Sequence, residues 1–108
     1  VNILMAIAQA SVPTSLGAVF TASSETAITS AFFLNDSGST VTLNIAVVPS
    51  GTGSPSISAN GIIKSLSVES GDTYILDVEK IILGAGDTVQ ASASASSAIV
   101  ATFSYVVV

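Results

Sequence analysis

The 108-residue chain contains no cysteine, no histidine and no tryptophan. Without cysteine there is no disulfide to staple the fold, and no thiolate to act as a nucleophile or a soft metal ligand. Without histidine there is no Ser-His dyad, no imidazole ligand for zinc, and no side chain that titrates near neutral pH by default. The sequence therefore predicts a protein that is not an enzyme, with no catalytic residues, no bound cofactor and no metal site.

Charge is also scarce, because charged residues make up 8% of the chain, against about a quarter in an average soluble domain. The basic residues are Lys64 and Lys80, and the net charge is -5. A protein that binds nucleic acid must neutralise phosphates with clustered Lys or Arg, so we expect no nucleic-acid partner. Small neutral side chains replace the missing charge and lose little rotamer entropy when another chain covers them. This composition predicts a homo-oligomer or a larger assembly.

Long hydrophobic runs are missing too, although the mean hydropathy is +0.78. No stretch approaches the roughly 18 unbroken apolar residues of a spanning helix, so we expect no membrane partner. The apolar N-terminal segment lacks the basic flank and the cleavage pattern of a signal peptide. We expect residues 1–108 to form one domain, in which residues 1–15 are a first strand or an arm that docks on a neighbour.

The pattern that the chain does have is an alternation of apolar and small polar residues with period two. Turn signals separate about eight such segments at near-regular spacing, and no segment has the period of an amphipathic helix. The sequence therefore predicts an all-β fold, an antiparallel β-sandwich of the jelly-roll type. The residues expected to lie in its core are Phe32, Leu43, Ile45, Leu76, Val89 and Phe103.

One turn frame, an apolar residue, a two-residue gap, Gly-Asp and a return to apolar, occurs twice. Its copies are centred on Gly71-Asp72 and on Gly86-Asp87. Glycine can adopt the positive φ of a tight turn, and aspartate can accept hydrogen bonds from nearby backbone. Both copies therefore predict a strand, a turn and a new strand.

Two other connections are visible in the sequence. A turn that contains Asp36 and Gly38 separates residues 28–34 from residues 41–47, and we expect these two strands to pair as a hairpin. Residues 49–60 are rich in Ser, Gly and Pro and predict an irregular surface loop.

The position of Lys64 conflicts with the alternation around it. Lys64 shares its phase with Ile62, Leu66 and Val68, which would direct its ammonium group toward the core. Either a β-bulge near residues 61–64 shifts the register, or Lys64 lies at an interface and pairs with an acid. A bulge or a strand-end position is the favoured interpretation, because an unpaired buried charge is costly.

Two segments are candidates for contacts with other chains. One face of residues 89–95 carries three alanines, which would let another sheet or another subunit approach closely. The apolar N-terminal segment has no evident partner strand in its own sequence. The predicted interface residues are Ile3, Met5, Ile7, Ala91, Ala93 and Ala95.

The acidic residues leave two chemical alternatives open. Asp77 and Glu79 lie two apart on one face of a predicted strand, and a carboxylate pair can hydrolyse glycosides, although an acidic rim that keeps the protein soluble is the favoured interpretation. Asp36, Asp72 and Asp87 could supply oxygen ligands to calcium, although turn capping explains these residues without an ion.

Much of the chain resembles a known class of protein in rhythm and composition. The matching segments are the turn at residues 35–36 and residues 40–49, 67–73, 78–83 and 86–94. They are similar to small virion structural proteins of tailed bacteriophages, of the capsid cement or decoration type. The resemblance implies a non-enzymatic β-sandwich, often a trimer, that sits on a capsid or belongs to the tail. We expect the chain to be made in the host cytoplasm and to lie on the outer surface of the particle against the major capsid protein or another virion protein, because its acidic balance suits the outside of a particle rather than its DNA-facing interior.

Two other functions remain open beside the cement protein. The first is a phage tail or fibre module, which would bind host glycans through residues 49–60. The second is a small carbohydrate-active enzyme that uses Asp77 and Glu79.

Overall fold

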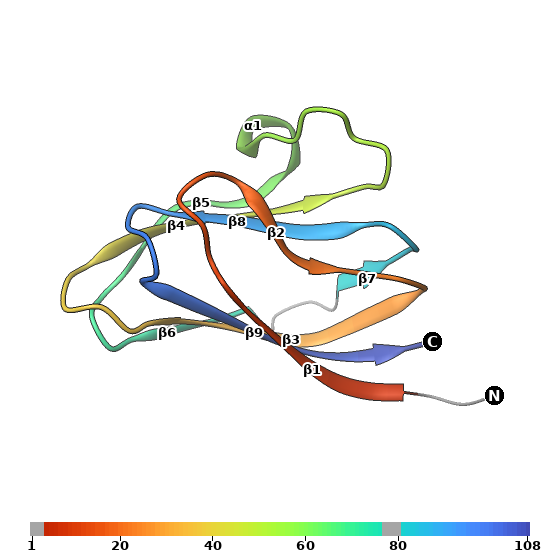
Figure 1. Ribbon diagram of the computed structural model, residues 1–108, viewed down its shortest axis with the longest axis horizontal. Helices are drawn as coiled ribbons and strands as arrows, with labels where there is room; N and C mark the ends of the chain where they lie inside the picture. Colours follow the sequence, from red (N-terminus) through yellow and green to blue (C-terminus); the bar gives the residue numbers. More distant parts are fainter. Residues whose placement is uncertain (1–3, 77–80) are drawn as a thin grey trace.

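The structure, a computed structural model that describes residues 4–76 and 81–108, consists of two antiparallel β-sheets packed face to face (Figure 1). Nine strands and one short helix make up the described chain. The elements are β1 (Leu4–Ser11), β2 (Gly17–Thr21), β3 (Thr26–Asn35), β4 (Val41–Val48), α1 (Ile57–Asn60), β5 (Gly61–Val68), β6 (Thr73–Leu76), β7 (Ile81–Leu83), β8 (Thr88–Ala93) and β9 (Ile99–Val107).

The order of the strands identifies the type of sandwich. One sheet, here called the β1 sheet, has the order β1-β9-β3-β6, with β7 also paired to β3; the other, the β2 sheet, has the order β2-β8-β4-β5. β6 and β7 both run antiparallel to β3, on successive stretches of it, so they count as one strand, the sixth of eight. In this count the first strand pairs with the eighth, the second with the seventh, the third with the sixth and the fourth with the fifth. The chain is thus arranged like one long hairpin that has been rolled up. This arrangement is a jelly roll, so the predicted fold class is confirmed.

The predicted hairpin between residues 28–34 and 41–47 is wrong. These segments became β3 and β4, which belong to opposite sheets. The two Gly-Asp turns also connect strands of different sheets, β5 to β6 and β7 to β8. In a rolled-up hairpin most partner strands are far apart in the sequence, and among the described strands β4 and β5 alone are both consecutive and paired.

A β-bulge in β3 reverses the predicted orientation of two phenylalanines. The pairing of β3 with β9 shifts register between Ile28 and Ser30. Ile28 is buried, but beyond the bulge Phe33 is 0% exposed and Phe32 is 37% exposed. An extra residue moves every later side chain to the other face of a strand. The prediction that Phe32 lies in the core is therefore wrong, and Phe33 takes that place.

The core between the sheets is built around aromatic rings. The Phe103 ring lies 5.4 Å from the Phe20 ring and 5.9 Å from the Phe33 ring, the latter edge to face. Tyr105 meets Phe20 in a second edge contact at 4.9 Å. Such offset and edge geometries are the favourable ones for aromatic pairs.

Most of the other predicted core residues are buried as expected. Leu43, Ile45 and Val89 are 0% exposed, and Phe103 is 1% exposed. Leu76 is half-buried and packs against the rim of the core.

The predicted bulge near Lys64 is present. In the pairing of β5 with β4, Lys64 and Ser65 together oppose Asn44. Ser65 has a φ of 56°, and its N–H donates to Asn44 Oδ1 at 2.8 Å. The bulge leaves Lys64 exposed to solvent and turns Ile63, rather than Ile62, toward the core.

The segment of residues 49–60 is a surface connection, but it contains the four-residue helix α1. The Ser56 hydroxyl caps this helix by accepting from Ala59 N at 3.2 Å. The expectation of no helix is wrong for this one turn, which a cap holds rather than the apolar face that periodicity detects. Within the described ranges, no helix has the length and the apolar character needed to cross a membrane.

Candidate functional site

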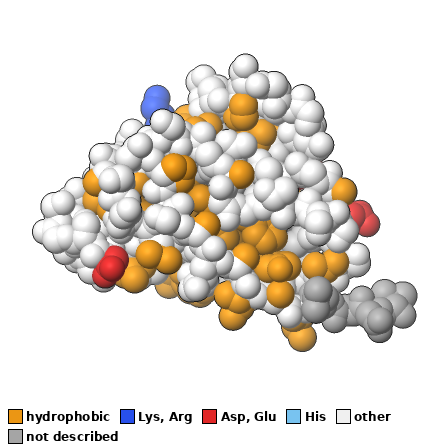
Figure 2. Space-filling view, in the orientation of Figure 1, with side chains coloured by type: hydrophobic (Ala, Val, Ile, Leu, Met, Phe, Trp, Pro, Cys, Tyr) orange, Lys and Arg blue, Asp and Glu red, His pale blue; other side chains and the backbone are white. Residues whose placement is uncertain are grey.

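The outer face of the β1 sheet carries the largest group of exposed apolar side chains in the described chain. These side chains, here called the outer-face patch, are Met5, Ile7, Phe32, Leu34, Ile75, Ile82 and Val100, and they are 37 to 75% exposed. None of the residues that the described strands of this sheet direct outward is charged. In Figure 2 hydrophobic side chains gather along the lower edge of the molecule, where Figure 1 places this sheet.

Strand register arranges the side chains of the patch in groups. Phe32 lies opposite Ile75 on one neighbouring strand, and Leu34 lies opposite Val100 on the other. Paired residues of adjacent strands have their Cβ atoms about 4.5–5.5 Å apart. Phe32, Leu34, Ile75 and Val100 therefore form one apolar group, and Met5, Val106, Ala27 and Ile82 align in a second group across the same sheet.

The polar groups between the apolar rows bond to one another. Gln9 Nε2 donates to Thr102 Oγ1 at 3.1 Å, and the Thr29 hydroxyl donates to Ser104 O at 3.0 Å. A polar group that already has a partner loses less when water is removed than one left unpaired. A partner could therefore cover this face at a modest desolvation penalty.

The predicted interface residues of the N-terminal segment lie partly on this surface. Met5 is 75% exposed and Ile7 is 71% exposed, whereas Ile3 lies outside the described residues. β1 pairs with β9 from Leu4 to Ser11. The segment is thus the first strand of the sheet, and the expectation that it has no partner in its own chain is wrong.

The alanine face of β8 is not available to a subunit. Ala91 is 0% exposed and Ala93 is 3% exposed, while Ala95 is half-buried against the core. This face packs against the chain's own β1 sheet. For Ala91 and Ala93 the prediction that another sheet approaches is therefore right, and the prediction of a subunit contact is wrong.

The rest of the patch was not predicted from the sequence. The sequence predicts Phe32 in the core, and it gives no contact role to Leu34 or Ile75. The missed signal is that several strands of this sheet are apolar in both phases, which is unusual for a sheet with one face in water.

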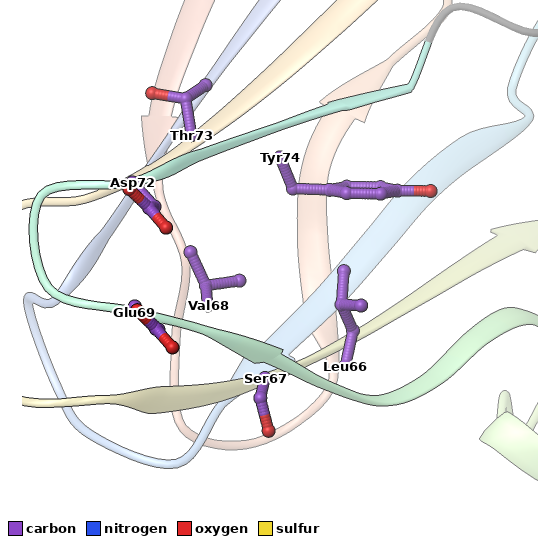
Figure 3. Close-up of a pocket in the computed structure, with 7 residues that line it drawn as sticks. All are labelled: Leu66, Ser67, Val68, Glu69, Asp72, Thr73 and Tyr74. Carbon is purple, nitrogen blue, oxygen red and sulfur yellow. The ribbon is translucent and has the colours of Figure 1, made fainter.

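A pocket of about 320 Å³ lies between β5 and β6, at the edge of the sandwich opposite β1 and β2 (Figure 3). The Tyr74 ring extends from β6 across the pocket, and Leu66 and Val68 point up from β5. Glu69 and Asp72 stand where the two strands join. The pocket thus combines an aromatic ring and an apolar floor with two carboxylates.

The three candidate calcium ligands do not converge. Asp72 O accepts from Asn35 N at 2.9 Å, at the end of β3, whereas Asp87 O accepts from Ala22 N at 3.0 Å, just before β3 begins. The ten residues of β3 separate these sites by about 30 Å. Asp36 follows Asn35 at the Asp72 end. Across residues 4–76 and 81–108 no three acidic side chains form a metal-binding group, and Asp77 and Glu79 lie outside those ranges.

The two Gly-Asp frames form turns between strands, as predicted, and they make the same backbone contacts. Gly71 has a φ of 79° and Gly86 a φ of 88°. Gly71 N donates to Asn35 O and Gly86 N donates to Ala22 O, both at 2.8 Å. In each frame the chain crosses from one sheet to the other, and the hydrogen bond ties this turn to the end of another strand. The role of both frames is therefore structural.

Asp36 and Gly38 lie in the connection between β3 and β4, as expected for turn residues. Asp36 N donates to Ala98 O at 2.8 Å, which ties this connection to the segment before β9. These residues likewise serve the fold.

Asp87 acts as a cap for two chain segments at once, and this predicts an acid sensitivity. Its carboxylate accepts from Ser50 N at 2.7 Å and from Gly84 N at 2.9 Å. These two donors, Ser50 first, lower the pKa of Asp87 below its usual value of 3.8, against a smaller opposing effect of desolvation. Since the folded pKa lies below the unfolded one, the ionised carboxylate stabilises the fold above about pH 4, and this stabilisation is lost as the pH falls through the folded pKa.

We therefore expect Asp87→Asn to have a lower melting temperature than wild type at pH 7. The difference in melting temperature should shrink toward zero at the most acidic pH at which the fold survives. Thermal unfolding followed by circular dichroism across this pH range measures the effect. Asp72→Asn, at the equivalent position of the other frame, is the matched control. A constant difference in melting temperature between wild type and Asp87→Asn at all pH values would show that its charge has no such role.

Fold and surface together define an eight-stranded jelly roll with an uncharged, apolar outer face. No family model, curated protein or solved structure matches the chain. The surface chemistry is therefore what bears on its function.

Proposed function

We propose that the chain is a non-enzymatic structural protein of a tailed-bacteriophage virion, which decorates and stabilises the capsid as a cement protein. The observation that carries this proposal is the outer-face patch, through which the chain would bind the major capsid protein or another virion protein on the outer surface of the particle. The jelly-roll fold supports it, because this fold recurs in viral capsid proteins. The sequence resemblance points to the same class.

Exposed apolar area is the property that makes the outer-face patch a binding surface. Contiguous exposed apolar patches of more than a few hundred Å² are rare on soluble monomers and mark interaction sites. Covering about 300 Å² of such surface yields on the order of 7 kcal/mol before the entropy of association is subtracted. One contact of this size is weak, but a particle offers many symmetric sites, and a decorating protein needs only to fill them.

Binding to particles tests the proposal, and the chain offers a matched pair of variants. Ile75 in β6 belongs to the outer-face patch, and Ile62 in β5 belongs to the other sheet; both are 46% exposed. Purified protein would be mixed with particles that lack it and sedimented. We expect wild type and Ile62→Ser to co-sediment, and Ile75→Ser to bind roughly tenfold more weakly, since burying an isoleucine side chain is worth about 1.5–3 kcal/mol and about 1.4 kcal/mol is a factor of ten. Failure of the wild type to co-sediment, or equal binding of both variants, would contradict the proposal.

The pocket beside Tyr74 favours one second candidate, a glycan-binding module of a phage tail or fibre. An aromatic ring can stack on a sugar, and carboxylates accept hydrogen bonds from its hydroxyls. The predicted location for such a site, residues 49–60, contains no aromatic residue. Glycan-array binding that Tyr74→Ala abolishes, together with no binding to capsids, would favour this candidate over the cement protein.

A further inference from the structure

The free edge of β1 is the least protected strand edge in the described chain. β1 forms the end of its sheet and pairs with β9 on one side only. The pairing covers all eight residues from Leu4 to Ser11 without a register shift. Its other side therefore presents a straight row of backbone groups.

The register identifies which residues own these groups. Val12 N donates to Ile99 O at 2.9 Å, directly beyond the last pair of the β1-β9 register. Hydrogen-bonded and non-bonded pairs alternate along an antiparallel ladder, so the even-numbered residues of β1 bond to β9. The odd-numbered residues Met5, Ile7 and Gln9 consequently direct their N–H and C=O groups outward.

The other edges have features that discourage pairing. β2 is five residues long and has a register shift between Ala18 and Phe20. β5 has the bulge at Ser65 and the charge of Lys64. β6 and β7 are four and three residues long. Short strands, bulges and lysines are the usual protection of edge strands, and β1, with the sequence LMAIAQAS, has none of them.

We infer that β1 pairs antiparallel with β1 of a second copy across a two-fold axis, which joins two β1 sheets into one continuous sheet. This partner fits because the edge is self-complementary: a two-fold axis at Ile7 places Ile7 opposite Ile7 of the second copy, and Met5 opposite Gln9. All outward backbone groups of these residues then bond to one another. The side chains of Met5 and Ile7, the most exposed of the large apolar residues described, meet at the junction. β1 itself is uncharged, so nothing in the strand opposes the pairing.

The area of this edge suits a specific dimer. β1 is about 27 Å long, and a two-layered sandwich with its side chains is about 20 Å thick. β2, the edge strand of the other sheet, lies beside β1, so both layers contribute to the contact. The two copies together would bury about 1,100 Å², which exceeds the roughly 1,000 Å² that a stable interface needs.

The inference is independent of the proposed virion role, and it differs from the trimer that the sequence resemblance implies. A two-fold interface uses the same surface on both copies. Since β1 is the unprotected edge, an isologous dimer satisfies it, whereas a three-fold ring would need β1 to meet one of the protected edges.

Molar mass in solution tests the inference with a matched pair of variants. The full chain would be measured by light scattering and sedimentation across micromolar concentrations. We expect wild type at twice its 10.7 kDa. Ile7→Lys should raise the dimer dissociation constant at least about tenfold by placing like charges opposite each other. Ile82→Lys, at an isoleucine of similar exposure on β7, three strands from β1 in the same sheet, should remain dimeric. A monomeric or trimeric wild type, or equal effects of both variants, would overturn the inference.

Two further measurements distinguish strand pairing from other contacts. Hydrogen exchange of the Met5, Ile7 and Gln9 amides should be slow in wild type and fast in Ile7→Lys, with the remaining core amides protected in both. Because the chain has no cysteine, Ile7→Cys should form a single disulfide across the axis, where Cα atoms of a hydrogen-bonded pair are about 5.5 Å apart. A dimer with unprotected β1 amides and no such disulfide would refute pairing through β1.

Discussion

Phe33→Ala is expected to lower the free energy of unfolding by about 3–5 kcal/mol, whereas the same substitution at the neighbouring Phe32 should cost only about 1 kcal/mol. Phe33 is 0% exposed, and its ring packs edge to face on Phe103 at 5.9 Å. Phe32 points away from the core and is 37% exposed. The two variants remove the same atoms from adjacent positions, so their difference reports the bulge in β3 directly.

Urea unfolding followed by far-ultraviolet circular dichroism measures both losses under identical conditions. Equal losses, or a larger loss for Phe32→Ala, would mean that the register shift between Ile28 and Ser30 is wrong.

Asn35→Ala is expected to be the most damaging substitution of a polar residue, at about 2–4 kcal/mol. Asn35 is 0% exposed. Its Nδ2 donates to the carbonyls of Ser39 and Val68, both at 2.8 Å, and its Oδ1 accepts from Ser37 N at 2.9 Å. The side chain thus links β3 of one sheet to β5 of the other, and its removal leaves a buried carbonyl and a backbone N–H without their partners.

The matched control is Asn60→Ala, in the surface segment that contains α1. Asn60 Oδ1 accepts from Ser56 N at 3.2 Å, so we expect a loss of about 0.5 kcal/mol. Comparable losses for the two asparagines, measured by urea unfolding, would contradict the account of Asn35 as a link between the sheets.

Strands, turns and fold class could be predicted from the sequence because each depends on a local pattern. Period two marks a strand, and Gly-Asp marks a turn, wherever they occur. Strand partners could not be predicted in the same way. Residues 28–34 and 41–47 have the pattern of a hairpin, yet a jelly roll pairs β3 with β9 and β6 and pairs β4 with β8, over long separations in sequence.

The bulges in β3 and β5 show when a register shift is visible in a sequence. Lys64 revealed the bulge in β5, because a charge in the apolar phase is inconsistent with a regular strand. The bulge in β3 left no such signal. Phe32 and Phe33 are both large and apolar, so either phase could have faced the core.

The candidate surface was predictable only in part for a related reason. Met5 and Ile7 were predicted as contact residues because the N-terminal segment is mostly apolar. The remaining patch residues lie on strands with two apolar faces, and such strands look like buried ones. The alanines of β8 were predicted at an interface but lie in or against the core. The sequence could not decide between these places, because a small apolar face fits a neighbouring sheet and a neighbouring subunit equally well.

A cryo-electron microscopy map of intact particles that contain this chain tests the central claim most directly. We expect jelly-roll density on the outer surface of the capsid, with the face that carries Phe32, Leu34 and Ile75 turned toward the shell. Density confined to the tail, or a jelly roll whose outer-face patch points into solvent, would contradict it.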